Sequence, residues 1–245
     1  MIVGFALAAT GLLATAAPPL TAPPPPSAHG TATAHAVTAV RGGAAGVRAI
    51  RPGDRGPAVR ALQKRLRTLR YDPGPANGSY GETTRAAVWA FQKVNRMRPT
   101  GIVGKRERAA LKHPRAPRRL VRHRARNRVE IDLRRQVLVV YRKGRVALIT
   151  HISTGSGRRY CHRGRCGIAR TPRGDFRVTR RVRGWRHSPL GYMYRPLYFH
   201  NGYAMHGSVK VPLRPVSHGC VRIPMHTADI VPRLVRNRTP VHVRR

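Results

Sequence analysis

The sequence predicts two folded domains, a small three-helix bundle followed by a mainly β domain. Residues 48–112 repeat apolar side chains with a helical period, and residues 127–245 change to an alternation of two. Between them, residues 113–126 combine prolines with a run of cationic side chains, which is typical of a linker. A chain of 245 residues is long enough for two modest domains, each with its own core.

The helical prediction for residues 48–112 rests on the spacing of apolar side chains. Val59, Leu62, Leu66 and Leu69 fall at i, i+3, i+7 and i+10, so they share one face of a helix. This face predicts an amphipathic helix that packs against the rest of a small bundle.

A second helix and a short third helix are predicted after a turn rich in glycine and proline at residues 72–81. Thr83 or Thr84 is expected to cap the first of them, because a threonine hydroxyl accepts a hydrogen bond from a free backbone N–H group at a helix start. The apolar faces of these two helices comprise Ala87, Val88, Phe91, Ala110 and Leu111.

The β prediction for residues 127–245 rests on alternation of apolar and polar side chains. Apolar residues alternate before and after a turn at residues 142–145, which predicts a hairpin. The hairpin's apolar residues are Val137, Val139, Tyr141, Val146, Leu148 and Ile152. Two further strands are predicted at residues 176–178 and 241–243.

Carboxylates are scarce in this chain, which has 8 Asp and Glu. Glu130 and Asp132 are the closest pair in sequence, and we expect them on a solvated face of a strand. The sequence therefore does not predict the close inward pair of carboxylates that glycosidases and aspartic proteases use.

The N-terminal residues predict export. Residues 1–17 form an apolar, alanine-rich run with small residues near its end, as in a signal peptide. The apolar stretch is shorter than the roughly twenty residues that a membrane helix needs, so no stable membrane span is expected. Residues 18–47 are rich in Pro, Ala, Thr and Gly and are predicted to form a disordered spacer.

The charge balance is strongly basic, with 49 Lys and Arg against 8 Asp and Glu and a formal net charge of +41 at pH 7. Such a charge favours polyanionic partners, which include nucleic acid, anionic cell-wall polymers and anionic membrane surfaces. The chain shows no cationic stripe on a recognisable recognition helix, and predicted export points away from DNA. Specific nucleic-acid binding is therefore not expected.

The three cysteines suggest one reactive thiol. Cys161 and Cys166 enclose four residues, and a disulfide could join them in an oxidising compartment. Cys220 is then unpaired, and an unpaired thiol in an exported protein is a candidate reactive group. The alternative is a buried, inert cysteine.

The sequence around Cys220 favours a reactive thiol. His218 and Arg222 flank it at i−2 and i+2, so in an extended segment all three side chains project to one face. With His206 they supply the imidazole or guanidinium that lowers the pKa of a thiol and favours the thiolate. Gly219 lets backbone N–H groups approach a developing oxyanion closely.

A zinc site is the alternative interpretation of the same residues. His200, His206, His218 and Cys220 would supply four ligands. Their spacing contains neither a Cys-x-x-Cys nor a His-x-x-x-His pair, which makes a metal site the weaker hypothesis. We expect no metal or other cofactor.

Residues 198–207, Tyr-Phe-His-Asn-Gly-Tyr-Ala-Met-His-Gly, and residues 217–222, Ser-His-Gly-Cys-Val-Arg, resemble the active-site signature of L,D-transpeptidase (YkuD-type) catalytic domains. Ser-Thr-Gly at 153–155 and Thr-Pro-Arg-Gly-Asp-Phe at 171–176 resemble two further elements of that family. The resemblance covers residues 127–245 nearly throughout and implies a mainly β sandwich.

The first domain resembles the peptidoglycan-binding domain type 1, a three-helix module that anchors proteins to the cell wall. The resemblance is carried by residues 51–56, the turn Asn-Gly-Ser-Tyr-Gly at 77–81, Leu62-Gln63, Thr84, Ala87-Val88 and Phe91-Gln92.

Together the two resemblances imply a secreted, wall-associated enzyme of peptidoglycan biosynthesis, cell-wall biogenesis and cell shape. It would cross-link stem peptides (3→3) through a cysteine thioester. The alternatives are an L,D-carboxypeptidase of the same fold, in which water resolves the thioester, and a non-catalytic wall-binding protein. The expected partners are stem peptides, glycan and anionic wall polymers.

The resemblance implies a role for each residue of the motif. Cys220 matches the nucleophile, and His206 matches the general base. The backbone carbonyl of Gly207 or Ser208 is expected to orient the imidazole of His206. The backbone N–H groups of Gly219 and Cys220 are expected to form the oxyanion hole.

Other residues are expected to hold the loop or bind substrate. A side-chain hydrogen bond from His218 is expected to hold the loop. Substrate binding is assigned to Arg222, Ser217 and Tyr203, with Arg222 binding the stem's carboxylate through two parallel hydrogen bonds. The aromatic segment 185–198 is expected to form either a lid over the donor peptide or part of the core.

Overall fold

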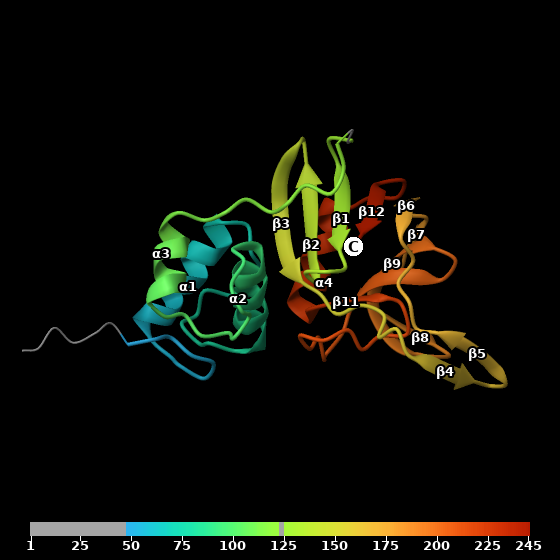
Figure 1. Cartoon of the computed structure of the whole chain (residues 1–245), viewed down its shortest axis with the longest axis horizontal. Coiled ribbons are helices and arrows are strands. Elements are labelled where there is room, and N and C mark those ends of the chain that lie inside the picture. The colour runs from blue at the N-terminus through green and yellow to red at the C-terminus, as the bar shows by residue number, and fades with distance from the viewer. Residues whose placement is uncertain (1–47, 123–124) are drawn as a thin grey trace, which may run out of the picture. The chain divides into compact units, whose positions relative to one another are not determined.

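The computed structural model describes residues 48–122 and 125–245. The predicted signal peptide and spacer lie outside the described residues. The described residues fall within one compact unit, Ala45–Arg245, which contains a helical module followed by a β module (Figure 1). Among these residues, no helix has the length and apolar character needed to cross a membrane.

The helical module consists of α1 (Pro57–Thr68), α2 (Glu82–Val94) and α3 (Lys105–Lys112), which confirms the three predicted helices. Val59, Leu62 and Leu66 are buried along one face of α1, as their spacing predicts. Leu69 follows the end of α1 and packs against the same core.

The start of α2 differs from the prediction. The residue before the helix is Gly81, and no side chain caps the helix. The Thr84 hydroxyl donates to the carbonyl of Pro73 (2.9 Å) and accepts a hydrogen bond from Nε2 of Gln63 (3.0 Å). This threonine therefore ties the preceding turn to α1, a use that depends on partners distant in sequence.

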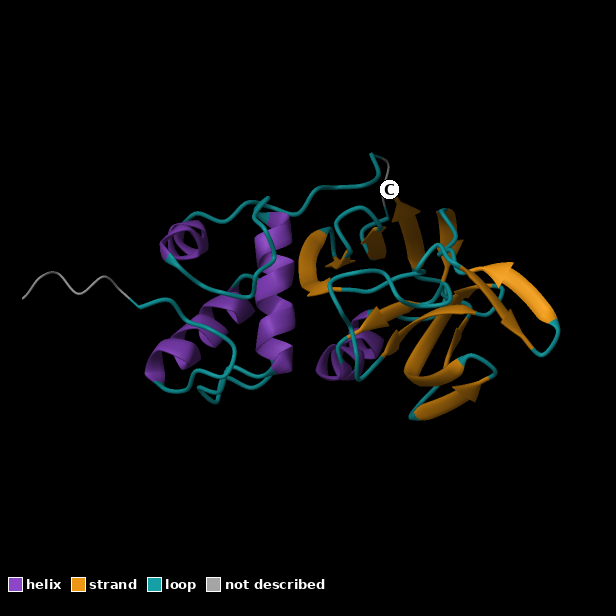
Figure 2. Cartoon of the chain, turned by 60° about the horizontal axis from the view of Figure 1, so that its bottom comes forward, coloured by secondary structure: helices purple, strands orange, loops and turns teal. Residues whose placement is uncertain are grey.

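The β module is a sandwich of two sheets, in agreement with the predicted fold class (Figure 2). The first sheet has the order β3-β2-β1-β12-β6 and comprises β1 (Arg128–Asp132), β2 (Val137–Arg142), β3 (Arg145–His151), β6 (Gly174–Arg177) and β12 (Pro240–Arg244). The second has the order β11-β10-β9-β7, with β8 also paired to β9, and comprises β7 (Arg180–Arg181), β8 (Trp185–Ser188), β9 (Gly191–His200), β10 (Tyr203–Gly207) and β11 (Val221–Ile223).

Two further elements complete this module. A separate hairpin, β4 (Arg159–His162) and β5 (Arg165–Ile168), projects from the sandwich (Figure 1). Helix α4 (Met225–Leu234) packs on the core through Ala228 and Val231. Helix α4 is not expected from the sequence, because its interior contains Pro232, a residue that normally indicates a helix end.

The predicted hairpin at residues 137–152 is the antiparallel pair β2–β3. The strands predicted at 176–178 and 241–243 correspond to β6 and β12, which pair with each other.

Strand β2 contributes to two cores. Leu138 and Val140 pack inside the sandwich, together with residues of the second sheet. Val137, Val139 and Tyr141 point to the other face and join the core of the helical module. Because both faces of the strand are covered, β2 consists almost entirely of buried residues.

The expectation of a solvated face for Glu130 and Asp132 is wrong. Both are buried in β1, and Glu130 forms a 2.7 Å ion pair with Arg128, each residue being 1% exposed. The guanidinium of Arg128 also lies 3.6 Å from the ring centre of Tyr141, and Glu130 accepts a hydrogen bond from the backbone N–H of Leu120. The pair is therefore a structural element of the covered sheet.

Candidate active site

Strands β10 and β11 bring the two sequence motifs together. They pair in parallel, with His206 opposite Arg222 and Met205 opposite Val221. Cys220 immediately precedes β11. Residues that are about fifteen positions apart in sequence therefore meet at one place in the sheet.

A cleft of about 540 Å³ lies over this place. Six of the seven predicted site residues line it: Tyr203, His206, Ser217, His218, Cys220 and Arg222. The seventh, Gly219, is buried within the loop. Residues 186–193, from β8 and the start of β9, form another part of the lining, whereas Phe199 belongs to the core.

The imidazole of His206 is buried and held in one orientation. Its Nδ1 atom lies 2.9 Å from the carbonyl oxygen of Gly207, which confirms the expected orienting contact. A carbonyl only accepts, so Nδ1 carries the proton and Nε2 keeps its lone pair. Burial lowers the pKa of His206 to about 4, with the charge of Arg222 acting in the same direction. The imidazole is therefore neutral at pH 7.

The thiol of Cys220 is free and half-buried. Burial raises its pKa, and this effect exceeds the opposite effects of a backbone hydrogen bond with Ala204 and of the Arg222 charge. The expectation of a resting thiolate is therefore wrong. A neutral thiol and a neutral imidazole share the cleft at pH 7.

The loop before β11 is held by its own hydrogen bonds. The Ser217 hydroxyl donates to the carbonyl of Cys220 (2.5 Å) and accepts from the backbone N–H of Gly219 (3.0 Å). Thr171 donates its hydroxyl proton to the Gly219 carbonyl at 2.7 Å. The N–H group of Gly219, expected in the oxyanion hole, is thus occupied in this structure, and so is the hydroxyl of Ser217.

Glycine is required at position 219 for two reasons. Its φ of +135° lies in a region that other residues rarely adopt. A Cβ atom there would also lie 2.4 Å from Cε1 of Tyr203 and 2.9 Å from the carbonyl oxygen of Arg170. The loop therefore passes closely between these two neighbours.

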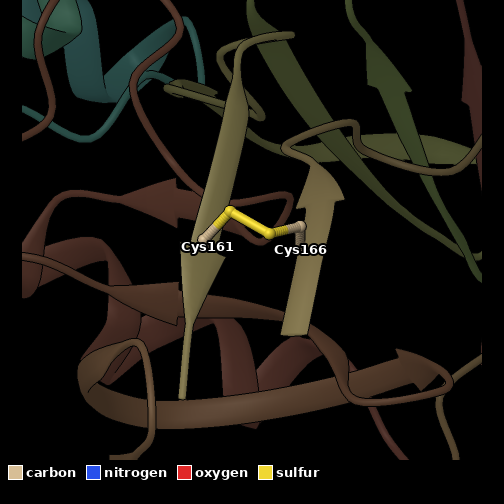
Figure 3. Close-up of a disulfide and its surroundings, with 2 residues drawn as sticks. All are labelled: Cys161 and Cys166. Carbon is tan, nitrogen blue, oxygen red and sulfur yellow. A yellow bond between two sulfur atoms is a disulfide. The ribbon is translucent and has the colours of Figure 1, made fainter. Parts of the chain in front are cut away.

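His218 does not form the expected hydrogen bond. Its side chain has no hydrogen-bond partner among the residues that the structure describes, and the residue is exposed at the cleft. Its ring instead meets the ring of Tyr160 edge-on, with centres 4.9 Å apart. Tyr160 belongs to the β4–β5 hairpin, where a disulfide joins Cys161 to Cys166 (Figure 3).

The geometry gives no support to the zinc alternative. Within residues 48–122 and 125–245, no three His, Cys, Asp or Glu side chains form a group that could hold a metal ion. The ring of His200 stacks on Tyr203 and packs against Phe176, with ring centres 6.1 and 4.7 Å apart.

Comparisons with known proteins agree with this geometry. A family model of L,D-transpeptidase catalytic domains matches residues 126–243, and a model of peptidoglycan-binding domains matches residues 55–111. The solved structure of an L,D-transpeptidase from Xylanimonas cellulosilytica is 41% identical with a TM-score of 0.75, and the match covers 80% of this chain and 97% of that one. The chain belongs to the L,D-transpeptidase family.

A second L,D-transpeptidase, from Stackebrandtia nassauensis, matches at 22% identity with a TM-score of 0.47, over 79% of this chain and 93% of that one. By the two family models, the present L,D-transpeptidase combines an N-terminal peptidoglycan-binding domain with a C-terminal L,D-transpeptidase catalytic domain.

Two residues beside the site of this L,D-transpeptidase are missing from the sequence prediction. Tyr160 lines the cleft from a hairpin that is distant in sequence from the motifs. His151 is fully buried at the end of β3 and contacts the segment that precedes Ser217. The one available signal for His151 is its position just before the Ser-Thr-Gly element at 153–155.

Proposed function

We propose that this L,D-transpeptidase is exported and forms 3→3 cross-links between peptidoglycan stem peptides through a thioester on Cys220. The observation that carries the proposal is the shared cleft of Cys220, His206 and Arg222, in which Nε2 of His206 has its lone pair available. Nucleophile, base and a cation for a carboxylate are the groups that acyl transfer between peptides needs.

Acylation begins when Sγ of Cys220 attacks the carbonyl carbon of the third residue of the donor stem. Nε2 of His206 takes the thiol proton during the attack, because both groups are neutral at rest. The bond to the terminal D-Ala then breaks, and His206 gives the proton to the departing amine. A thioester on Cys220 remains.

Transfer repeats these steps with a second stem. An amine of the acceptor attacks the thioester carbonyl and loses a proton to His206, and the proton returns to the sulfur as the C–S bond breaks. With water in place of the amine, the same intermediate would give a carboxypeptidase.

The loop geometry modifies the expected roles of three residues. The backbone N–H of Cys220 is proposed to stabilise the oxyanion, and that of Gly219 contributes only when it is released from the Ser217 hydroxyl. Ser217 is accordingly proposed to hold the loop in place of binding substrate. Tyr203 supports Gly219 and forms part of the cleft wall.

Arg222 is proposed to bind a carboxylate of the stem peptide. Its side chain is half-buried in the cleft, and no Asp or Glu among the described residues forms an ion pair with it. The net charge of +41 would add a longer-range attraction to anionic wall polymers, which salt should weaken.

Incubation with isolated peptidoglycan, followed by separation of the muropeptides by mass, tests this function. New dimers linked through the third stem residue are expected, and Cys220→Ala should form none. Tripeptides without dimers would indicate a carboxypeptidase. A carbapenem should add its mass to the wild-type chain and not to Cys220→Ala, and a chain that neither reacts nor cross-links would be a binding protein.

A further inference from the structure

A lysine of the peptidoglycan-binding module reaches the catalytic module. Lys93 lies near the end of α2, and its Nζ atom lies 3.2 Å from the carbonyl oxygen of Gln136 and 2.7 Å from Nδ1 of His151. The ring of Trp89, one turn earlier in α2, meets the His151 ring edge-on with centres 5.3 Å apart. The amino group of Lys93 thus lies where α2 packs on the end of β3.

The imidazole of His151 makes hydrogen bonds through both of its nitrogens. Nε2 lies 3.0 Å from the carbonyl oxygen of Val211 and 3.1 Å from that of Pro212. Carbonyls only accept, so the ring proton is on Nε2, and Nδ1 accepts from an N–H of the Lys93 amino group. Burial lowers the pKa of Lys93 to about 7, and the amino group can donate in either protonation state. Burial and the charge of Lys93 lower the pKa of His151 to about 3, in agreement with a neutral ring. Lys93 therefore selects the tautomer that binds the two carbonyls.

The two carbonyls belong to the segment that joins the proposed base to the proposed nucleophile. Residues 208–216 run from the end of β10, which carries His206, to the loop that carries Cys220. The residues after His151 hold the same segment, because Ser153 donates to the carbonyl of Arg214 (2.8 Å) and the Thr154 carbonyl accepts from the N–H of Ser217 (2.9 Å). The pair Lys93–His151 holds the middle of the segment, at the carbonyls of Val211 and Pro212.

We propose that Lys93 and His151 are positioning residues, through which the peptidoglycan-binding module fixes the segment 208–216 and thereby the placement of Cys220 relative to His206. The proposal rests on the proposed function, since that function makes Cys220 and His206 the reacting groups. Neither Lys93 nor His151 lines the cleft, so both act through the segment. The rate of catalysis then depends on the contact between Lys93 of the peptidoglycan-binding module and His151 of the catalytic module.

The test compares variants of the full chain. Lys93→Met keeps the length of the side chain and removes the donor, and His151→Phe keeps a ring against Trp89 and removes the hydrogen bonds of both ring nitrogens. Lys64→Met, at an exposed position of α1, is the matched control. Two quantities are measured: the rate and saturation of Cys220 acylation by a carbapenem, and amide hydrogen exchange of residues 208–217.

Both Lys93→Met and His151→Phe should slow acylation about tenfold and change the half-saturating concentration less than about twofold, because placement of the reacting groups is altered and not binding. Exchange of residues 208–217 should become faster in both. The double variant should be no slower than the slower single variant, since the two residues act as one unit. Lys64→Met should match the wild type.

His151→Gln keeps an N–H donor for the carbonyls and should recover part of the rate, which a general loss of packing would not explain. It also serves as the decisive variant if His151→Phe fails to fold. Wild-type acylation and exchange in Lys93→Met would overturn the proposal. If the wild type is not acylated, the proposed function fails, and the exchange comparison still decides whether the pair fixes the segment.

Discussion

The Nδ1 atom of His206 lies 2.9 Å from the carbonyl oxygen of Gly207, the next residue in the chain. A backbone group thus takes the orienting role that a carboxylate often has beside a catalytic histidine. This carbonyl carries no full charge, so it stabilises the protonated ring only slightly. Desolvation disfavours the protonated ring more strongly, and the pKa of His206 therefore falls to about 4.

We expect the acid limb of the pH dependence of Cys220 acylation to lie near pH 4. His206 accepts a proton only when neutral, and its lowered pKa keeps it neutral well below the 6.5 of an ordinary histidine. The measurement is the rate of carbapenem acylation against pH, with circular dichroism at each pH to verify folding. A limb near pH 6.5 in a folded protein would show that burial does not control this base.

Gly219→Ala should abolish most activity. The new methyl group would require a strained φ of +135° and would collide with Cε1 of Tyr203 and the carbonyl of Arg170. Strain of this kind costs about 1–3 kcal/mol, and displacement of the neighbouring thiol should reduce acylation about a hundredfold or more. Stopped-flow acylation and denaturant unfolding measure the two effects.

Gly184→Ala is the matched control for this substitution. Gly184 also has a positive φ, +66°, but no atom lies within 4 Å of a Cβ placed there. Its replacement should cost about 1 kcal/mol of stability and leave acylation unchanged. Equal loss of activity in both variants would mean that backbone strain, and not the close approach to Tyr203, explains the glycine at 219.

Glu130→Gln should strongly destabilise the fold without altering the cleft. Arg128 would remain buried beside Tyr141 without its carboxylate, and breaking a buried pair typically costs about 3–5 kcal/mol. Glu82→Gln, which breaks an exposed pair with Arg85, should cost less than about 1 kcal/mol. Guanidinium unfolding compares the two, and similar values would mean that the buried pair contributes little.

The sequence predicts best those features that depend on neighbours along the chain. The spacing of Val59, Leu62 and Leu66 is sufficient for α1, and the motif around Cys220 is sufficient to identify the cleft. Predictions fail where a distant group supplies the partner. Thr84 donates to the carbonyl of Pro73 in place of capping its helix, and His218, which lacks the expected hydrogen bond, meets the ring of Tyr160 from the distant β4–β5 hairpin.

Desolvation is the other property that local sequence does not contain. Arg222 beside Cys220 suggests a thiolate, yet burial of Cys220 against Met193, Tyr198 and Ala204 reverses the direction of the pKa shift. In the same way Glu130 lies in a strand-like pattern with a polar side chain, yet all five residues of its strand β1 are buried. Burial of a single position follows from the whole fold and not from its neighbours.

The Cys161–Cys166 disulfide should affect substrate binding more than stability. The bond joins opposite positions of β4 and β5 and encloses only four residues, so its removal should cost about 2 kcal/mol or less. The hairpin strands are mostly exposed, and the adjacent Tyr160 lines the cleft and contacts His218. Replacing both cysteines with serine should therefore loosen this wall and raise the KM for a donor stem peptide several-fold, with a smaller change in kcat.

Tyr160 provides the control for this prediction. Tyr160→Ala, with the disulfide intact, should raise KM to a similar extent, and Tyr160→Phe should retain the wild-type value because the edge-on ring contact with His218 needs no hydroxyl. Steady-state kinetics with a tetrapeptide donor measures all three variants. If Tyr160→Ala raises KM while the double serine variant does not, the Tyr160 ring contributes to substrate binding without the disulfide. The turn of the hairpin is then sufficient to keep Tyr160 in place.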